Sequence, residues 1–122
     1  MDASTVDFSD VNPDATSYVL GDTDMGTIGN ATIQNQGNVV IDIGMNGTDL
    51  TGSAGTITVG NAAYRFDTGS YISFTGSKET EDVNVPVGAT EYNKIDFELY
   101  VPVGTASGSY SGTVTVTAET NT

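Results

Sequence analysis

Cysteine and histidine are both absent from the 122-residue chain. Without cysteine there is no disulfide bond, no thiolate nucleophile and no cysteine-ligated zinc. Without histidine, the common Ser-His-Asp and Cys-His arrangements and the usual zinc ligand sets are excluded as well. The sequence therefore predicts a protein that is not an enzyme.

Basic residues are scarce, since Arg65, Lys78 and Lys94 stand against sixteen acidic residues and leave a formal charge of −13. Such a field repels phosphate backbones and anionic lipids. The sequence therefore predicts that the protein binds neither nucleic acid nor a membrane surface. The acids are dispersed among polar residues, which is typical of a solvated surface, whereas adaptation to high salt and capture of divalent cations are the alternatives.

Long apolar runs are also missing, so the chain contains no candidate membrane span. Met1 is followed by polar residues rather than by a basic and then apolar segment. We therefore expect a natural precursor to carry an export signal or an anchor outside this sequence. No segment has the 3.6-residue apolar period of a helix, and we expect no helix longer than a single turn.

Alternating apolar residues are what the sequence does contain, most clearly at 95–101 and 110–116. Ile95, Phe97, Leu99 and Val101 point to one side of their strand, because successive side chains of a strand alternate between its faces. The turn-rich segment between the two runs predicts a long antiparallel hairpin over 93–118. Its apolar face requires a second sheet to cover it.

Shorter alternating runs predict further strands at 4–8, 31–33, 39–45, 56–59, 64–66, 71–75 and 83–87, and 18–20 is a brief extended piece. We expect 31–33 and 39–45 to form a second hairpin, Asn46-Gly47 to form a turn, and 77–82 to be a polar break. This spacing favours an all-β fold, an immunoglobulin-like antiparallel β-sandwich of about eight or nine short strands. It forms one domain over 1–122, with 1–3 and 119–122 as frayed ends or linker.

The aromatic residues divide between the predicted core and the surface. Tryptophan is absent, which weakens the case for a glycan-stacking platform. Five aromatic residues fall on predicted core faces, where packing is the favoured interpretation: Phe8, Phe66, Phe74, Phe97 and Tyr110. Tyr100 lies on the outward face of its strand and is the aromatic residue that merits attention.

Asp10, Asn12 and Asp14 occupy positions 1, 3 and 5 of an EF-hand-like calcium loop. The pattern then departs from the motif, because the required glycine and the bidentate glutamate are both missing. A proline-containing Asx turn is therefore the favoured interpretation. Asp22 and Asp24 would add carboxylates if the two loops meet in space.

Two further kinds of motif carry weaker signals. Asn30 and Asn46 begin N-glycosylation sequons, which are competent only in an exported chain. Glu79 with Glu81, and Asp96 with Glu98, are the carboxylate pairs that could hydrolyse a glycoside. Because we expect both pairs on solvent-facing positions or loops, no catalytic residue is assigned.

Residues 32–43 with 47–51, residues 57–64 and residues 97–116 together resemble secreted, immunoglobulin-like domains of archaeal and bacterial cell-surface proteins, including methanogen surface proteins. The last segment, Phe-Glu-Leu-Tyr-Val-Pro-Val-Gly-Thr-Ala-Ser-Gly-Ser-Tyr-Ser-Gly-Thr-Val-Thr-Val, is the most specific of the three. The resemblance implies a sandwich fold and an extracellular setting, and it carries over no catalytic motif.

The predicted function is a non-catalytic structural or interaction module of an exported cell-surface or cell-envelope protein. Its partners would be other envelope proteins or further copies of itself. One alternative is a pilus-like filament subunit assembled by exchange of the strand at 2–8. The other is a calcium-dependent adhesion domain. No cofactor is predicted apart from the calcium of that second alternative.

Overall fold

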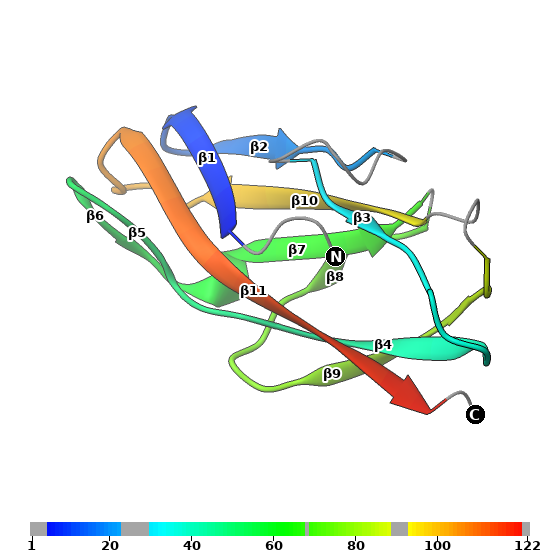
Figure 1. Cartoon of the computed structure of the whole chain (residues 1–122). Helices are drawn as coiled ribbons and strands as arrows, with labels where there is room; N and C mark the ends of the chain where they lie inside the picture. The colour runs from blue at the N-terminus through cyan, green and yellow to red at the C-terminus, as the bar shows by residue number, and fades with distance from the viewer. Residues whose placement is uncertain (1–4, 23–29, 68, 89–92, 121–122) are drawn as a thin grey trace.

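Two antiparallel sheets pack face to face in the computed structural model, which describes residues 5–22, 30–67, 69–88 and 93–120 (Figure 1). The first sheet contains β1 (Thr5–Val11), β4 (Ile41–Gly47), β5 (Leu50–Gly52), β6 (Gly55–Ile57), β9 (Glu79–Val85) and β11 (Gly108–Thr120). The second contains β2 (Ala15–Val19), β3 (Thr32–Ile33), β7 (Ala62–Phe66), β8 (Ile72–Ser73) and β10 (Asn93–Val101). Within the described ranges the only helical element is the 3-10 turn η1 (Val59–Asn61). The predicted all-β antiparallel sandwich is confirmed, with eleven strands in place of eight or nine.

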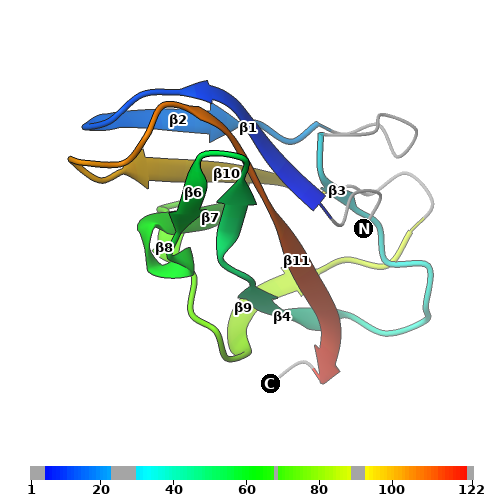
Figure 2. The same cartoon turned by 90° about the vertical axis from the view of Figure 1, so that its left-hand side faces the viewer.

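The thirteen-residue strand β11 organises the first sheet. Along its first half it pairs with β1, where Phe8 lies opposite Tyr110, and on the other side with β5. Along its second half, 114–120, it pairs with β4. The sheet curls because its long central strand changes partners along its length (Figure 2).

The pairing of β1 and β11 bears on two expectations about the chain ends: strand exchange at 2–8 and fraying at 119–122. Residues 5–11 are hydrogen-bonded within their own domain, so most of the strand proposed for exchange at 2–8 has a partner already. The predicted frayed end at 119–122 is wrong for Glu119 and Thr120, which belong to β11. Residues 1–3 and 121–122 lie outside the described residues. Along 114–120, β4 is the one neighbour of β11 among the described strands.

The predicted hairpin over 93–118 is wrong, because β10 belongs to the second sheet and β11 to the first. β10 pairs with β2 and β3 on one side and with β7 on the other, so no bonding edge is left for β11. The alternation correctly identified the buried faces, but it carries no information about which strand lies alongside. The sandwich therefore differs from immunoglobulin domains, in which the last two strands share a sheet.

The second predicted hairpin is also wrong, since β3 pairs with β10 while β4 pairs with β11 and β9. Asn46 and Gly47 are the end of β4 rather than a turn. Gly47 packs closely against the Phe74 ring: a Cβ there would lie 3.2 Å from it, so the ring would have to shift by a few tenths of an ångström to admit a larger residue. The expected polar break at 77–82 is largely strand β9, in which Glu79 and Glu81 take inward positions opposite Met45 and Ile43 at the rim of the sandwich.

The core lies between the sheets and contains the apolar faces that the alternation predicted. Ile95, Phe97, Leu99 and Val101 of β10 are all buried. Of the five aromatic residues assigned to the core, four are buried, and Phe66 is half-buried against them. The rings of Phe74 and Phe97 stack at 6.0 Å between centroids and 11° between planes.

We predict that Phe97→Ala lowers the free energy of unfolding by about 3–5 kcal/mol, because truncating a buried aromatic side chain leaves a cavity. Urea denaturation followed by circular dichroism measures the loss. The control is Val103→Ala in the β10–β11 connection, where the side chain is 76% exposed; we expect a change within about 0.5 kcal/mol. Equal losses in the two variants would contradict the assignment of the core.

Candidate functional site

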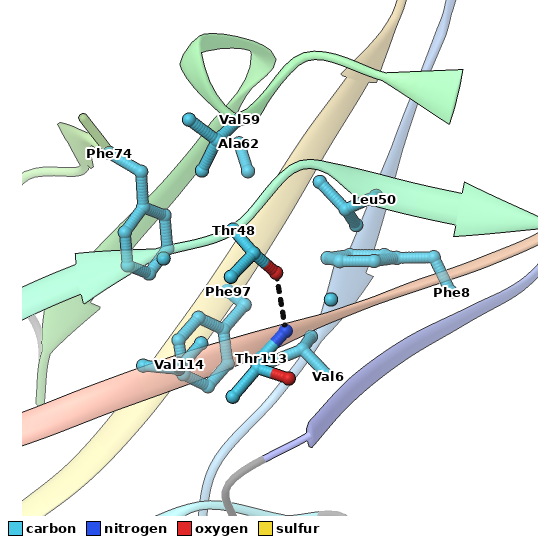
Figure 3. A pocket seen from close by; sticks show the side chains of 12 residues that line it. Val6, Phe8, Thr48, Leu50, Val59, Ala62, Phe74, Phe97, Thr113 and Val114 are labelled. Atoms are coloured by element: carbon cyan, nitrogen blue, oxygen red, sulfur yellow. Dashed lines mark hydrogen bonds between the residues drawn. The ribbon is translucent and has the colours of Figure 1, made fainter. Parts of the chain in front are cut away.

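The pocket between the sheets is a small gap in the packing that offers little room for a ligand. Its volume is about 20 Å³. Its walls are mainly apolar side chains from both sheets, among them Val6, Phe8, Leu50, Phe74, Phe97 and Val114 (Figure 3). The polar atoms of the Thr48–Thr113 pair at its wall are satisfied, because the backbone N–H of Thr113 donates to Thr48 Oγ1 at 2.9 Å. A mainly apolar space large enough for about one water molecule is too small for ligand recognition.

The EF-hand-like segment forms the turn between β1 and β2. Asp10 belongs to β1, and Asn12 and Asp14 follow it. Asp14 has a left-handed backbone, with φ of 58°, and its N–H donates to the carbonyl of Val101 at 2.7 Å. The side chains serve local hydrogen bonds: the Tyr100 hydroxyl donates to Asp14 Oδ1 at 2.9 Å, and the Ser107 hydroxyl donates to Asn12 Oδ1 at 3.3 Å.

The second acidic loop does not meet the first. Asp22 lies beyond the far end of β2, whose five residues alone span roughly 16 Å. There the Thr32 hydroxyl donates to Asp22 Oδ1 at 2.7 Å. Asp24 lies outside the described residues. In the described part of the chain no group of three or more acidic side chains could hold a metal ion.

We therefore expect calcium chloride and sodium chloride to raise the thermal midpoint equally at matched ionic strength, because both screen the acidic surface. Differential scanning calorimetry of the whole chain makes the comparison. A rise specific to calcium that disappears in Asp14→Asn would contradict this expectation, since a ligand that binds only the folded state stabilises it by mass action.

The two sequons lie in different surroundings. Asn30 precedes β3, and its Nδ2 donates to the carbonyl of Leu20 at 2.8 Å. Asn46 is half-buried in β4 opposite Thr115, not at a turn as predicted. Glycosylation at either residue stays a prediction.

The carboxylate pair on β9 is partly structural. The Tyr64 hydroxyl donates to Glu81 Oε1 at 2.7 Å, and the Tyr64 side chain is completely buried. Burial raises the pKa of Tyr64 above its ordinary value of about 10, and the hydrogen bond to Glu81 raises it further. Glu81 thus holds a buried hydroxyl at the rim of the core.

This raised pKa predicts a loss of stability in alkali. The folded state holds the Tyr64 proton more tightly than the unfolded state, so its contribution to stability is complete below about pH 10 and is lost as the pH rises above that value. Unfolding free energies measured between pH 8 and roughly pH 11 should therefore fall less steeply in Tyr64→Phe than in the wild type. The matched control is Tyr18→Phe, at a side chain that is 57% exposed. Identical slopes for the wild type and Tyr64→Phe would refute this role.

The other carboxylate pair, Asp96 with Glu98, was expected to face solvent, but Asp96 does not. Asp96 lies on the outward face of β10, yet it is only 1% exposed. Its Oδ2 accepts a hydrogen bond from Arg65 Nε at 2.8 Å, and its Oδ1 accepts one from the backbone N–H of Gly21 at 2.9 Å. A buried carboxylate that is paired in this way positions other groups, and the hydrolytic pairing with Glu98 finds no support in it.

Around Asp96 the outer face of the second sheet gathers aromatic side chains. We call Tyr18, Arg65, Tyr71, Glu98 and Tyr100 the tyrosine–arginine surface. The Tyr18 and Tyr71 rings lie 6.2 Å apart, and the Arg65 guanidinium lies 4.7 Å from the centre of the Tyr71 ring. In the strand register Tyr18 is opposite Glu98, which is in turn opposite Ala63 on β7. Ala63 is buried without belonging to the core, as expected if side chains of the outer face cover it.

The charge states of the groups in this surface follow from their hydrogen bonds and burial. The hydrogen bond to Asp96 raises the pKa of Arg65 above its ordinary value. Burial raises the pKa of Tyr71, although the Arg65 charge opposes that effect. The hydrogen bond to Asp14 raises the pKa of Tyr100. These groups therefore keep their charge states through the physiological range: a cationic guanidinium and neutral phenols.

Two members of this surface, Tyr100 and Glu98, were singled out from the sequence, Glu98 only as half of a carboxylate pair, and three were missed. Tyr100 was recognised because it is outward in a long alternating run. Tyr18 and Tyr71 lie in or beside short strands, in which alternation is too brief to define a face. Arg65 gave no signal, since a single cation in a strand does not reveal that a buried aspartate lies opposite it on β10.

No family model, curated protein or solved structure matches the chain. In the described ranges no helix is both long and apolar enough to span a bilayer.

Proposed function

We propose that the protein is a non-catalytic structural and interaction module of an exported cell-surface or cell-envelope protein. The observation that carries the proposal is the tyrosine–arginine surface. Tyr18 and Tyr100 are 57% and 42% exposed on the outer face of a sheet whose inner face is locked into the core. Large exposed aromatic side chains on a rigid scaffold favour recognition, because little conformational entropy is lost when a partner binds.

The envelope setting that we propose rests on a resemblance of the sequence, and the composition provides the solubility that such a module needs. A charge of −13 in a chain without cysteine keeps the folded domain soluble and repels other copies at low salt. The resemblance of residues 32–43 and 97–116 to secreted surface domains implies the same location. We therefore infer an extracellular position and partners among other envelope components.

A filament subunit is the second candidate, and the side of β11 that no described strand covers along 114–120 favours it. Residues 114–120 contain no proline, and their single charge, Glu119, is paired with Lys78. Within 114–120 there is therefore neither a proline nor an unpaired charge to oppose pairing with another strand. Against strand exchange at 2–8 stands the pairing of β1 within its own sheet.

The location is tested by labelling intact source cells with a membrane-impermeant amine reagent. The Lys78 side chain is 48% exposed and offers a reactive amine. We expect the protein to be labelled without lysis, while a cytoplasmic protein of the same cells stays unlabelled. Labelling only after lysis would refute the proposed location.

A further inference from the structure

We propose that the tyrosine–arginine surface is a binding site for a neutral carbohydrate chain. This inference rests on the proposed function, because it names the partner class of the same surface. Three properties of the surface support it: exposed aromatic faces, a fixed hydrogen-bond donor beside them, and a charge balance that disfavours ionic ligands.

The aromatic side chains provide an apolar surface with polar tips. Tyr18 lies opposite Glu98, and Tyr100 lies opposite Thr16, so the two tyrosines are diagonal neighbours on one face at roughly 7–8 Å between backbones. Leu20, directly after β2, is 53% exposed and adds apolar area. The C–H face of a sugar ring is apolar, while its rim carries hydroxyl groups. Such a ligand matches a tyrosine, which has an apolar body and a polar tip.

Arg65 is organised for binding before any ligand arrives. Asp96 engages its Nε, and Tyr71 lies against the guanidinium plane. Among the described residues no side chain or carbonyl accepts a hydrogen bond from its two terminal nitrogens. The side chain is 30% exposed, so these donors can reach a ligand. Glu98, half-buried beside Tyr18, provides a carboxylate acceptor. Sugar hydroxyls both donate and accept hydrogen bonds. The Arg65 guanidinium can donate to them, and the Glu98 carboxylate can accept from them.

Charge selects a neutral ligand over the ionic alternatives. An anionic ligand would meet the Glu98 and Asp96 carboxylates and the field of −13. A cationic ligand is attracted by that field, but at this surface it would meet the Arg65 cation, which already covers the Tyr71 ring. A neutral polyhydroxyl chain meets neither obstacle. It therefore fits the surface better than a phosphorylated glycan or a basic peptide.

The test is a printed array of neutral oligosaccharides, acidic oligosaccharides and lysine-rich peptides, probed with the whole labelled chain. We expect retention on one or more neutral oligosaccharides and none on the charged probes. Isothermal titration with the best neutral oligosaccharide then gives the dissociation constant. Absence of binding to every neutral probe, or retention on charged probes alone, would overturn the inference.

Two variants locate the site. Tyr18→Ala should weaken binding on the order of tenfold, because it removes a stacking face. Arg65→Lys keeps the charge but loses the planar donor fork, and should also weaken binding. The control, Val103→Ala, lies in the β10–β11 connection and should bind as the wild type does. Circular dichroism confirms that each variant is folded, and unchanged affinity in both folded site variants would overturn the assignment.

The outcome separates this inference from the proposed function. If the protein is labelled on intact cells but binds no neutral oligosaccharide, the carbohydrate site alone is wrong. If oligosaccharides bind while the protein is labelled only after lysis, the surface location is wrong and the binding site stands.

Discussion

The buried carboxylate of Asp96 is the constraint on which the second sheet depends. A charge that is 1% exposed must be compensated, because an isolated carboxylate is strongly disfavoured away from water. Arg65 compensates it from β7, and the backbone N–H of Gly21 compensates it from the segment after β2. Gly21 has to be glycine, since a Cβ there would collide with the carbonyl oxygens of Ile95 and Ala31. One side chain thus ties β2, β10 and β7 together.

The same interaction connects the fold with recognition. The inner face of β10 supplies the core through Ile95, Phe97, Leu99 and Val101, while the next outward positions carry Asp96, Glu98 and Tyr100. Because Asp96 fixes Arg65, and Arg65 lies against Tyr71, the rigidity of the core is transmitted to the exposed aromatic rings. A surface held in this way loses little entropy on binding, which supports the interaction role that we propose.

Alternation in the sequence predicted the class of fold and most of the core, because burial of one face leaves a two-residue period. It did not predict pairing. β10 and β11 are consecutive, and both alternate strongly. They nevertheless lie in different sheets, where each pairs with other strands. The site was largely unpredictable for a related reason. The contacts between Arg65, Asp96 and Gly21 join residues 31 and 75 positions apart, and no local pattern records them.

The proposed function depends on ligand binding at the outer face of β2, β10 and β7. Nuclear magnetic resonance of the labelled chain during titration with a neutral oligosaccharide tests this most directly. Shifts should concentrate at Tyr18, Tyr71, Tyr100 and the terminal nitrogens of Arg65, while the Arg65 Nε–H stays hydrogen-bonded to Asp96. Shifts concentrated instead on the exposed valines at 39, 40 and 87, or along the open side of β11 at 114–120, would contradict it.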